Sequence, residues 1–319
     1  MVLFEFVHLS SRTIALTDYI TRKFHKTISQ NRFDVEEQRG KWSDPGGGAI
    51  RIDVPGQQVL QRNSVVVTAD FVESRISITL PASGRKILSD AALDIFMTSL
   101  PFVVQNALLF SAYDSHDLET FISSVEDQDC LRKSVLEQGM RRLSTCKANK
   151  GYSCFVPNGA ILPRESGASD KPLPSNKAVP FLSPPSLEKT FALPYRGSIT
   201  GMAVPRGLTT IVGGGFHGKS TLLEAISLGV WNHIPGDGRE FTVTDPSAVE
   251  VRSEDGRNVS TVDISPFVNN LPGGGRTQEW SSEDASGSTS MAANVVEVFH
   301  LYRVSVDVGV RVWKSITLI

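Results

Sequence analysis

The 319-residue sequence has only three cysteines, and none of them stands at a spacing typical of zinc ligands. An odd number without such spacing argues against a disulfide framework or a structural metal site, and it predicts buried or free thiols in a reducing compartment. An excess of one charge is lacking as well, because 32 basic and 34 acidic side chains give a formal net charge of −2. The molecule as a whole is therefore not predicted to bind polyanions.

Long apolar runs and a targeting segment are also missing. The apolar C-terminal stretch 295–319 is interrupted by charged residues such as Glu297 and Asp307, so it does not predict a membrane span. The N-terminus carries Glu5 inside its first apolar run and has no basic residues ahead of that run, unlike a signal peptide. We therefore expect a protein without a membrane partner in the cytoplasm, with an organelle left open as the alternative.

The sequence does contain a phosphate-binding pattern. Residues 213–220, GGGFHGKS, fit G-x-x-x-x-G-K-[ST], in which glycines let backbone N–H groups approach phosphate oxygens. Lys219 would neutralise the β- and γ-phosphates of ATP, and Ser220 would place its hydroxyl on Mg²⁺. The predicted nucleotide-binding residues are Gly213, Gly214, Gly215, Phe216, His217, Gly218, Lys219, Ser220 and Thr221.

The setting of this loop agrees with the pattern. The β-branched run 208–212 predicts a strand that leads into the loop, and the apolar positions of 221–228 predict a helix that follows it. A strand at 198–204 would form a hairpin with 208–212. A chance glycine-rich turn is the alternative, but strand, loop, Lys-Ser and helix occur in the required order. The sequence therefore predicts a nucleotide-binding protein with ATP as its ligand.

Composition divides the chain into three parts. Strand patterns followed by helical patterns predict an N-terminal α+β domain over residues 1–150. Residues 151–190 combine short strands with a Pro- and Ser-rich linker. The nucleotide-binding domain is predicted over 191–319. Its short strands after the phosphate-loop helix are predicted at 240–244, 249–252 and 259–264, as an antiparallel insert.

The order of these features resembles the predicted ATPases of the ABC class, which are related to the ATPase domains of ABC transporters but lack transmembrane parts. The resemblance is densest from 197 to 294, and it includes the segments 233–240 (HIPGDGRE) and 263–267 (DISPF). It implies an α/β P-loop NTPase fold, with an ABC-type core and an antiparallel β insert, preceded by the α+β domain. It also implies ATP hydrolysis coupled to closure of a dimer.

The resemblance assigns a further role to residues 286–288. In an ABC-type homodimer each nucleotide lies between the phosphate loop of one subunit and the signature segment of its partner. Here Ser286, Gly287 and Ser288 hold the signature position. Small residues that open a helix suit this role, because their hydroxyl and backbone N–H groups can reach a γ-phosphate across an interface. An ordinary helix N-cap is the alternative.

The resemblance is lost after Asn294. The family pattern continues with an apolar strand that ends in Asp-Glu, which serve Mg²⁺ and the attacking water, and with a switch histidine. Residues 295–319 contain neither, and Asp307 lies within an alternating pattern typical of a strand. We therefore expect a truncated or alternatively spliced product, or a faulty gene model. The chain should bind ATP and Mg²⁺ but hydrolyse ATP poorly or not at all, and its catalytic residues are unknown.

Two other functions stay open at this stage. Basic residues within 12–26 and 141–150 would suit a nucleic-acid-associated module that binds RNA and uses ATP as a clamp switch. Alternatively, the chain does not fold stably and has no activity, because the strand that would carry the Asp-Glu pair is central to the family's sheet. The sequence does not identify a coupled process or a substrate.

Overall fold

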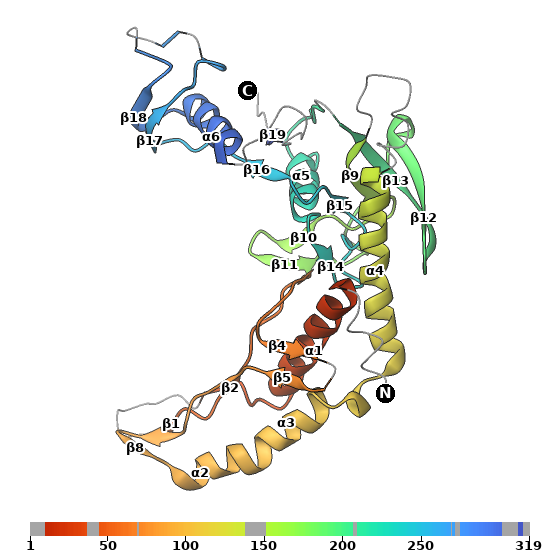
Figure 1. The fold of residues 1–319 in the computed structure, drawn as a ribbon, viewed down its shortest axis with the longest axis vertical. Coiled ribbons are helices and arrows are strands. Elements are labelled where there is room, and N and C mark those ends of the chain that lie inside the picture. Colours follow the sequence, from red (N-terminus) through yellow and green to blue (C-terminus); the bar gives the residue numbers. More distant parts are fainter. Residues whose placement is uncertain are drawn as a thin grey trace.

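The fold was obtained as a computed structural model that describes residues 10–36, 45–68, 70–137, 151–206, 209–268, 270–271, 275–301 and 312–314. Figure 1 shows three parts: an N-terminal lobe around α1, a central antiparallel sheet between α4 and α5, and a C-terminal part made of β17, β18 and α6. Among the described residues, no helix is long and apolar enough to cross a membrane.

The N-terminal lobe is organised on α1 (Ser10–Gln30). Leu16, Ile20, Phe24 and Ile28 recur every four residues along this helix, and all four are buried. They belong to one core together with side chains from the helical run 89–107 and from short strands. This run consists of α2 (Ser89–Asp94), a π-helical segment (Ile95–Ser99) and α3 (Leu100–Ala107).

The strands of this lobe are short and form separate antiparallel groups. β2 pairs with β6, β4 pairs with β5, and β7 lies between β1 and β8. The lobe thus has the α+β composition that we expected. The strands are β1 (Pro45–Gly46), β2 (Ile50–Arg51), β3 (Gln58–Val59), β4 (Val65–Val67), β5 (Val72–Ser74), β6 (Ser77–Ile78), β7 (Ala82–Ser83) and β8 (Lys86–Ile87).

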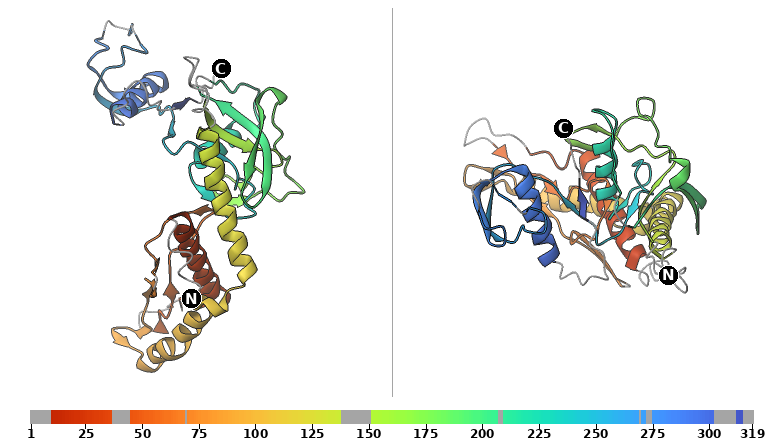
Figure 2. Two further views of the ribbon diagram at one scale, coloured as in Figure 1. Left: turned by 45° about the vertical axis from the view of Figure 1, so that its right-hand side comes forward. Right: turned by 90° about the horizontal axis from the view of Figure 1, so that it is seen from above.

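One long helix, α4 (Ser115–Glu137), joins the lobe to the central sheet. In its first half Leu118 and Ile122 pack in the core of the lobe with α1, whereas Leu131 and Val135 in its second half pack on the sheet. Figure 2 shows α4 running along both parts. A single helix is therefore part of two hydrophobic cores and fixes the sheet relative to the lobe.

The central sheet has the strand order β12-β13-β9-β15, and every pair in it is antiparallel. Side chains of β9 alternate across it: Phe155 lies in the core with α4, whereas Cys154 and Val156 lie in the core with α5 (Lys219–Leu228). α5 is the helix that the sequence predicted after the phosphate loop, so this prediction is confirmed. The strands are β9 (Tyr152–Pro157), β12 (Glu188–Leu193), β13 (Gly197–Pro205) and β15 (Val243–Thr244).

The predicted hairpin of 198–204 with 208–212 is wrong. β13 covers the first strand, but it pairs with β12 and β9, and residues 209–212 form no strand. A β-branched run becomes a strand only where neighbouring strands take up its hydrogen bonds, and no strand of the described residues pairs with 209–212. Val212 is accordingly 82% exposed. Leu208 lies outside the described residues.

The parallel sheet expected of an α/β P-loop core is not confirmed by the described residues. Among the described strands, β16 (Val249–Val251) and β19 (Val312–Lys314) form the parallel pair. β9, from the segment 151–190, is part of the same sheet as β12 and β13. The domain boundaries at 150 and 190 stay predictions, and so does any role of Asp307, which lies outside the described residues.

The C-terminal part has its own small core. β17 (Arg257–Val262) and β18 (Trp280–Ala285) form an antiparallel pair that packs on α6 (Gly287–Leu301). Figures 1 and 2 show this part standing apart from the central sheet, with β16 leading into it. Strands β15, β16 and β17 lie where the insert was predicted, but they pair with β9, β19 and β18 rather than with one another, and β16 is parallel to β19. The described residues therefore do not form the single antiparallel insert that we expected. The remaining strands are β10 (Arg164–Ser166), β11 (Ser169–Pro172) and β14 (Asn232–His233).

Candidate functional site

The phosphate loop is an exposed turn at the N-terminus of α5. All residues from 212 to 218 are exposed, and Gly218 leads into the helix with φ 77°, a left-handed conformation that glycine adopts readily. Lys219 Nζ donates a hydrogen bond to the carbonyl oxygen of Gly214 at 2.6 Å. This bond folds the lysine back over the loop, so that its charge lies beside the loop backbone.

These residues fit a phosphate group with its magnesium ion. The N–H groups of the first helical turn lack intrahelical acceptors, and the helix dipole adds partial positive charge at the same end. Lys219 has a carbonyl oxygen as its acceptor, and a phosphate oxygen can take that place. Ser220, which would hold Mg²⁺, is exposed in the first turn of α5.

Two residues of this loop, Phe216 and His217, have distinctive geometry. Phe216 has φ 61° and is fully exposed, which is a strained conformation for a residue with a side chain, costing roughly 1 kcal/mol or more. His217 lies against Gly214, where a Cβ atom would come within 3.1 Å of His217 Cε1. A side chain at position 214 would therefore crowd the ring of His217.

The other end of α5 is anchored by buried polar side chains. They bind carbonyl groups in and just after the last helical turn, which have no donors within the helix. The contacts come from the central sheet, from α4 and from the segment 233–240. They are Thr244 Oγ1 to Ile226 O at 2.6 Å, Arg132 Nη2 to Gly229 O at 3.2 Å, and His233 Nε2 to Leu228 O at 3.4 Å.

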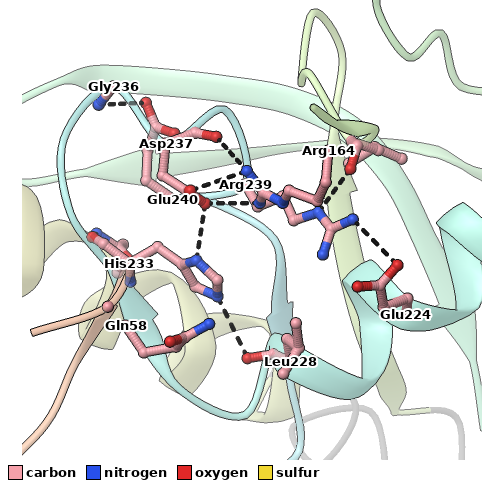
Figure 3. Close-up of polar contacts among 12 residues, drawn as sticks. Gln58, Arg164, Glu224, Leu228, His233, Gly236, Asp237, Arg239 and Glu240 are labelled. Carbon is pink, nitrogen blue, oxygen red and sulfur yellow. Dashed lines mark hydrogen bonds and ion pairs between the residues drawn. The ribbon is translucent and has the colours of Figure 1, made fainter. Parts of the chain in front are cut away.

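Beside α5 lies a group of ionisable side chains, shown in Figure 3, that we call the buried cluster: Arg164, His233, Asp237, Arg239 and the half-buried Glu240. Asp237 is fully buried. It accepts hydrogen bonds from Arg164 at 2.9 Å on each carboxylate oxygen, and its Oδ2 lies 2.8 Å from His233 Nδ1. A carboxylate is tolerated in such a place only when it is paired and hydrogen-bonded.

The surroundings of Asp237 favour its charged form. Burial by itself acts to raise the pKa of Asp237, but the hydrogen bond and charge of His233, together with Arg164, outweigh burial and hold the pKa below its usual range. Asp237 is therefore ionised at neutral pH. The stability that its contacts contribute depends on this charge.

Arg239 is also completely buried, but its guanidinium group is only partly bonded. Its Nε donates to the carbonyl of Leu162 at 2.7 Å, and its Nη2 lies 3.6 Å from Oε2 of Glu224 on α5. Neither Nη1 nor Nη2 has a hydrogen-bond partner among the described residues. Burial lowers the pKa of Arg239 and the nearby charge of Arg164 lowers it further, while Glu224 acts in the opposite direction.

Residues 286–288 open α6 as predicted. The carbonyl of Ser286 accepts the N–H of Ser290 at 2.8 Å, which places Ser286 at the N-cap position, and its Oγ lies 3.0 Å from Thr289 Oγ1. Ser286 and Ser288 are exposed. In Figures 1 and 2 α6 and α5 belong to different parts of the molecule, so the structure does not bring 286–288 into the phosphate loop of the same chain.

Two of the four Lys and Arg residues within 12–26 that suggested RNA binding, Arg12 and Arg22, form ion pairs. Arg12 binds Glu126 at 2.5 Å, and Arg22 binds Asp18 at 2.6 Å. Residues 141–150 lie outside the described residues. RNA as a partner stays a prediction from the sequence, and none of these contacts favours it.

The buried cluster was not identified as a site from the sequence. Its segment 233–240 entered only through the family resemblance, because proline and glycines around charged residues predict an exposed turn. The partner Arg164 lies 73 residues away from Asp237. No local pattern connects two positions so far apart.

Two known protein-family profiles together match nearly the whole chain. Residues 114–304 match the profile of the P-loop domain of the ABC-class ATPases, and residues 5–111 match the profile described as ATPase of the ABC class, N-terminal. The uncharacterized protein MJ1628 of Methanocaldococcus jannaschii is 28% identical over 194 residues, which cover 56% of this chain and 42% of that protein. The matched region thus spans less than half of that relative.

We predict that Asp237→Asn lowers stability in a pH-dependent way. At neutral pH the variant loses the charge that Arg164 and His233 bind, which should cost about 3–5 kcal/mol of unfolding free energy. In the wild type this contribution is complete above the ordinary carboxyl pKa of about 3.9 and is lost as the pH falls through the lower pKa of the folded state. The difference between the proteins should therefore shrink in acid.

Urea unfolding at pH 7 and at a series of values below pH 4.5 measures this difference. Asp170→Asn, at an exposed position on β11, is the control and should match the wild type throughout. A deficit of Asp237→Asn that stays constant across the acid range would contradict the prediction.

Proposed function

Because the chain belongs to the ATPases of the ABC class, we propose that it binds Mg-ATP through its phosphate loop. The backbone N–H groups of 213–221 surround the phosphates, Lys219 exchanges the Gly214 carbonyl for a phosphate oxygen, and Ser220 holds Mg²⁺. The supporting observation is an exposed loop at the N-terminus of a helix whose other end is buried. The loop is closed by the hydrogen bond from Lys219 Nζ to the carbonyl of Gly214. When bound, Mg²⁺ neutralises phosphate charge.

We expect Lys219→Ala to weaken ATP binding roughly 10- to 100-fold, because a charge-assisted contact to phosphate is lost. Titration with a fluorescent ATP analogue in the presence of Mg²⁺ measures the affinity. Lys171→Ala, an exposed lysine on β11, is the matched control and should bind as the wild type does. Equal affinity of the wild type and Lys219→Ala would refute the assignment.

Thermal unfolding gives a second readout of the same binding. Saturating Mg-ATP at about 100 times Kd should add about 2.7 kcal/mol to the unfolding free energy of the wild type. A cooperative transition that Mg-ATP raises in temperature would also exclude the alternative that the chain does not fold.

We further propose that two chains form a homodimer in which Ser286, Gly287 and Ser288 of one subunit contact the nucleotide held by the phosphate loop of the other. Two features support this proposal. The hydroxyl groups of Ser286 and Ser288 are exposed at the N-terminus of α6, a helix of 15 residues. That helix stands apart from α5 of its own chain, which suits contact with a nucleotide on another chain.

Ser288→Arg should block this dimer and leave ATP binding to the single chain intact. Sedimentation velocity with and without Mg-ATP measures the association. The wild type should dimerise with nucleotide, and Ser288→Arg should need at least tenfold more protein to do so, because a bulky cation replaces a small hydroxyl at the interface. Ser175→Arg, on the exposed turn 174–178, is the control. Unchanged dimerisation of Ser288→Arg would argue against residues 286–288 as the contact.

ATP hydrolysis is the activity implied by the family, and we expect little of it from this chain. Residues 295–319 contain no Asp-Glu pair, and the loss of a group that activates the attacking water typically costs ~10²–10⁴ in rate. Phosphate release from the wild type should therefore equal that from Lys219→Ala. Steady-state turnover near the ~10 s⁻¹ of ordinary enzymes, abolished by Lys219→Ala, would overturn this expectation.

A further inference from the structure

The position of Arg239 calls for an explanation other than stability. The residue is fully buried, and both terminal nitrogens lack hydrogen-bond partners among the described residues. Replacing a buried, poorly paired charge with an apolar side chain of similar volume is often neutral or stabilising. We therefore look for the role of this buried cation in the side chain that it attracts. That side chain is Glu224 of α5, whose Oε2 lies 3.6 Å from Arg239 Nη2.

Glu224 is placed to pass this attraction to the phosphate loop. It lies four residues after Ser220 on α5, so the two side chains share one face of the helix and are about one turn, or about 5.4 Å, apart. The attraction between Arg239 and Glu224 therefore bears on the helix face that carries Ser220. Ser220 directly follows Lys219 in the sequence. The side chain of Glu224 is 49% exposed, so it is free to move unless something holds it.

The other polar anchors of α5 act on its far end. Arg132, His233 and Thr244 contact backbone carbonyl groups at or after Ile226. The contact with Arg239 is made at Glu224, two residues before Ile226 and therefore nearer to the phosphate loop than the other anchors (Figure 3). Arg239 is itself held in place by the hydrogen bond from its Nε to the carbonyl of Leu162.

From this arrangement we infer that Arg239 is a positioning residue for the phosphate loop and acts through Glu224 on α5. The inference rests on the proposed binding of Mg-ATP. Arg239 holds Glu224 toward the sheet, and this fixes the orientation of α5 in which Lys219 and Ser220 face the nucleotide. It also offsets a carboxylate that would otherwise repel phosphates from one helical turn away.

Glu224→Gln tests the inference most directly, because the substitution keeps the size of a half-exposed side chain and removes its charge. Positioning predicts that Mg-ATP binds about tenfold more weakly, with little change in melting temperature. If Arg239 only offset the repulsion by Glu224, removing the carboxylate would leave the affinity unchanged or increase it. An affinity equal to or higher than that of the wild type would therefore overturn the inference.

Arg239→Met and the double variant test whether the two residues act as one unit. Arg239→Met should weaken binding about tenfold, and adding Glu224→Gln should weaken it no further, because both changes break the same contact. Arg239→Lys should restore part of the affinity. Fully additive losses would overturn the inference. If Arg239→Met does not fold, Glu224→Gln and Arg239→Lys decide the question.

Arg164→Met is the matched control for a purely structural effect. It removes the other buried arginine of the cluster, which binds Asp237 rather than α5. We expect a melting temperature at least as low as that of Arg239→Met and an affinity within about twofold of the wild type, measured well below the melting temperature. Equal losses of affinity in Arg164→Met and Arg239→Met would overturn the inference.

The wild type and Lys219→Ala separate this inference from the proposed function. If the wild type binds Mg-ATP in a Lys219-dependent way and Glu224→Gln binds equally well, only the inference fails. If the wild type shows no Lys219-dependent binding, the proposed function fails and takes the inference with it.

Discussion

The burial of one carboxylate, Asp237, is the constraint on which the surroundings of α5 depend. Its oxygens bring Arg164 of β10 and His233 of β14 to the same point. The backbone of His233 is in turn clamped by Gln128 of α4, which exchanges two hydrogen bonds with it at 2.8 Å. The helices on both faces of the central sheet are thus tied to one charged group that cannot be exposed without breaking several bonds at once.

This arrangement makes α5 unequal along its length. At its C-terminal end it is buried in the core with β9 and β13 and bonded to Arg132, His233 and Thr244. At its N-terminal end the phosphate loop is exposed, and Lys219 Nζ donates a hydrogen bond across it to the carbonyl of Gly214. A loop of this kind can exchange one acceptor for another without moving the helix, because stability in a protein is not uniform and binding loops come from its weaker end.

The parts that could be predicted from the sequence are those that depend on neighbouring residues. The phosphate loop with α5 and the start of α6 at Gly287 follow from local patterns of glycine, Lys-Ser and apolar spacing. The strand at 209–212 failed because a strand needs partners that its own sequence does not supply. The buried cluster was missed for a related reason: Arg164 and Asp237 read as surface charges until the fold brings them together.

Exposed apolar residues at the loop fit a site completed by a second chain. Val212 is 82% exposed and Phe216 is fully exposed in a strained conformation, so both side chains are largely open to solvent. Apolar groups beside a binding site contribute to affinity when a partner removes them from water. In the proposed dimer the signature segment of the partner approaches this loop. Closure over the nucleotide would then bury these side chains, and nucleotide binding and association would favour each other.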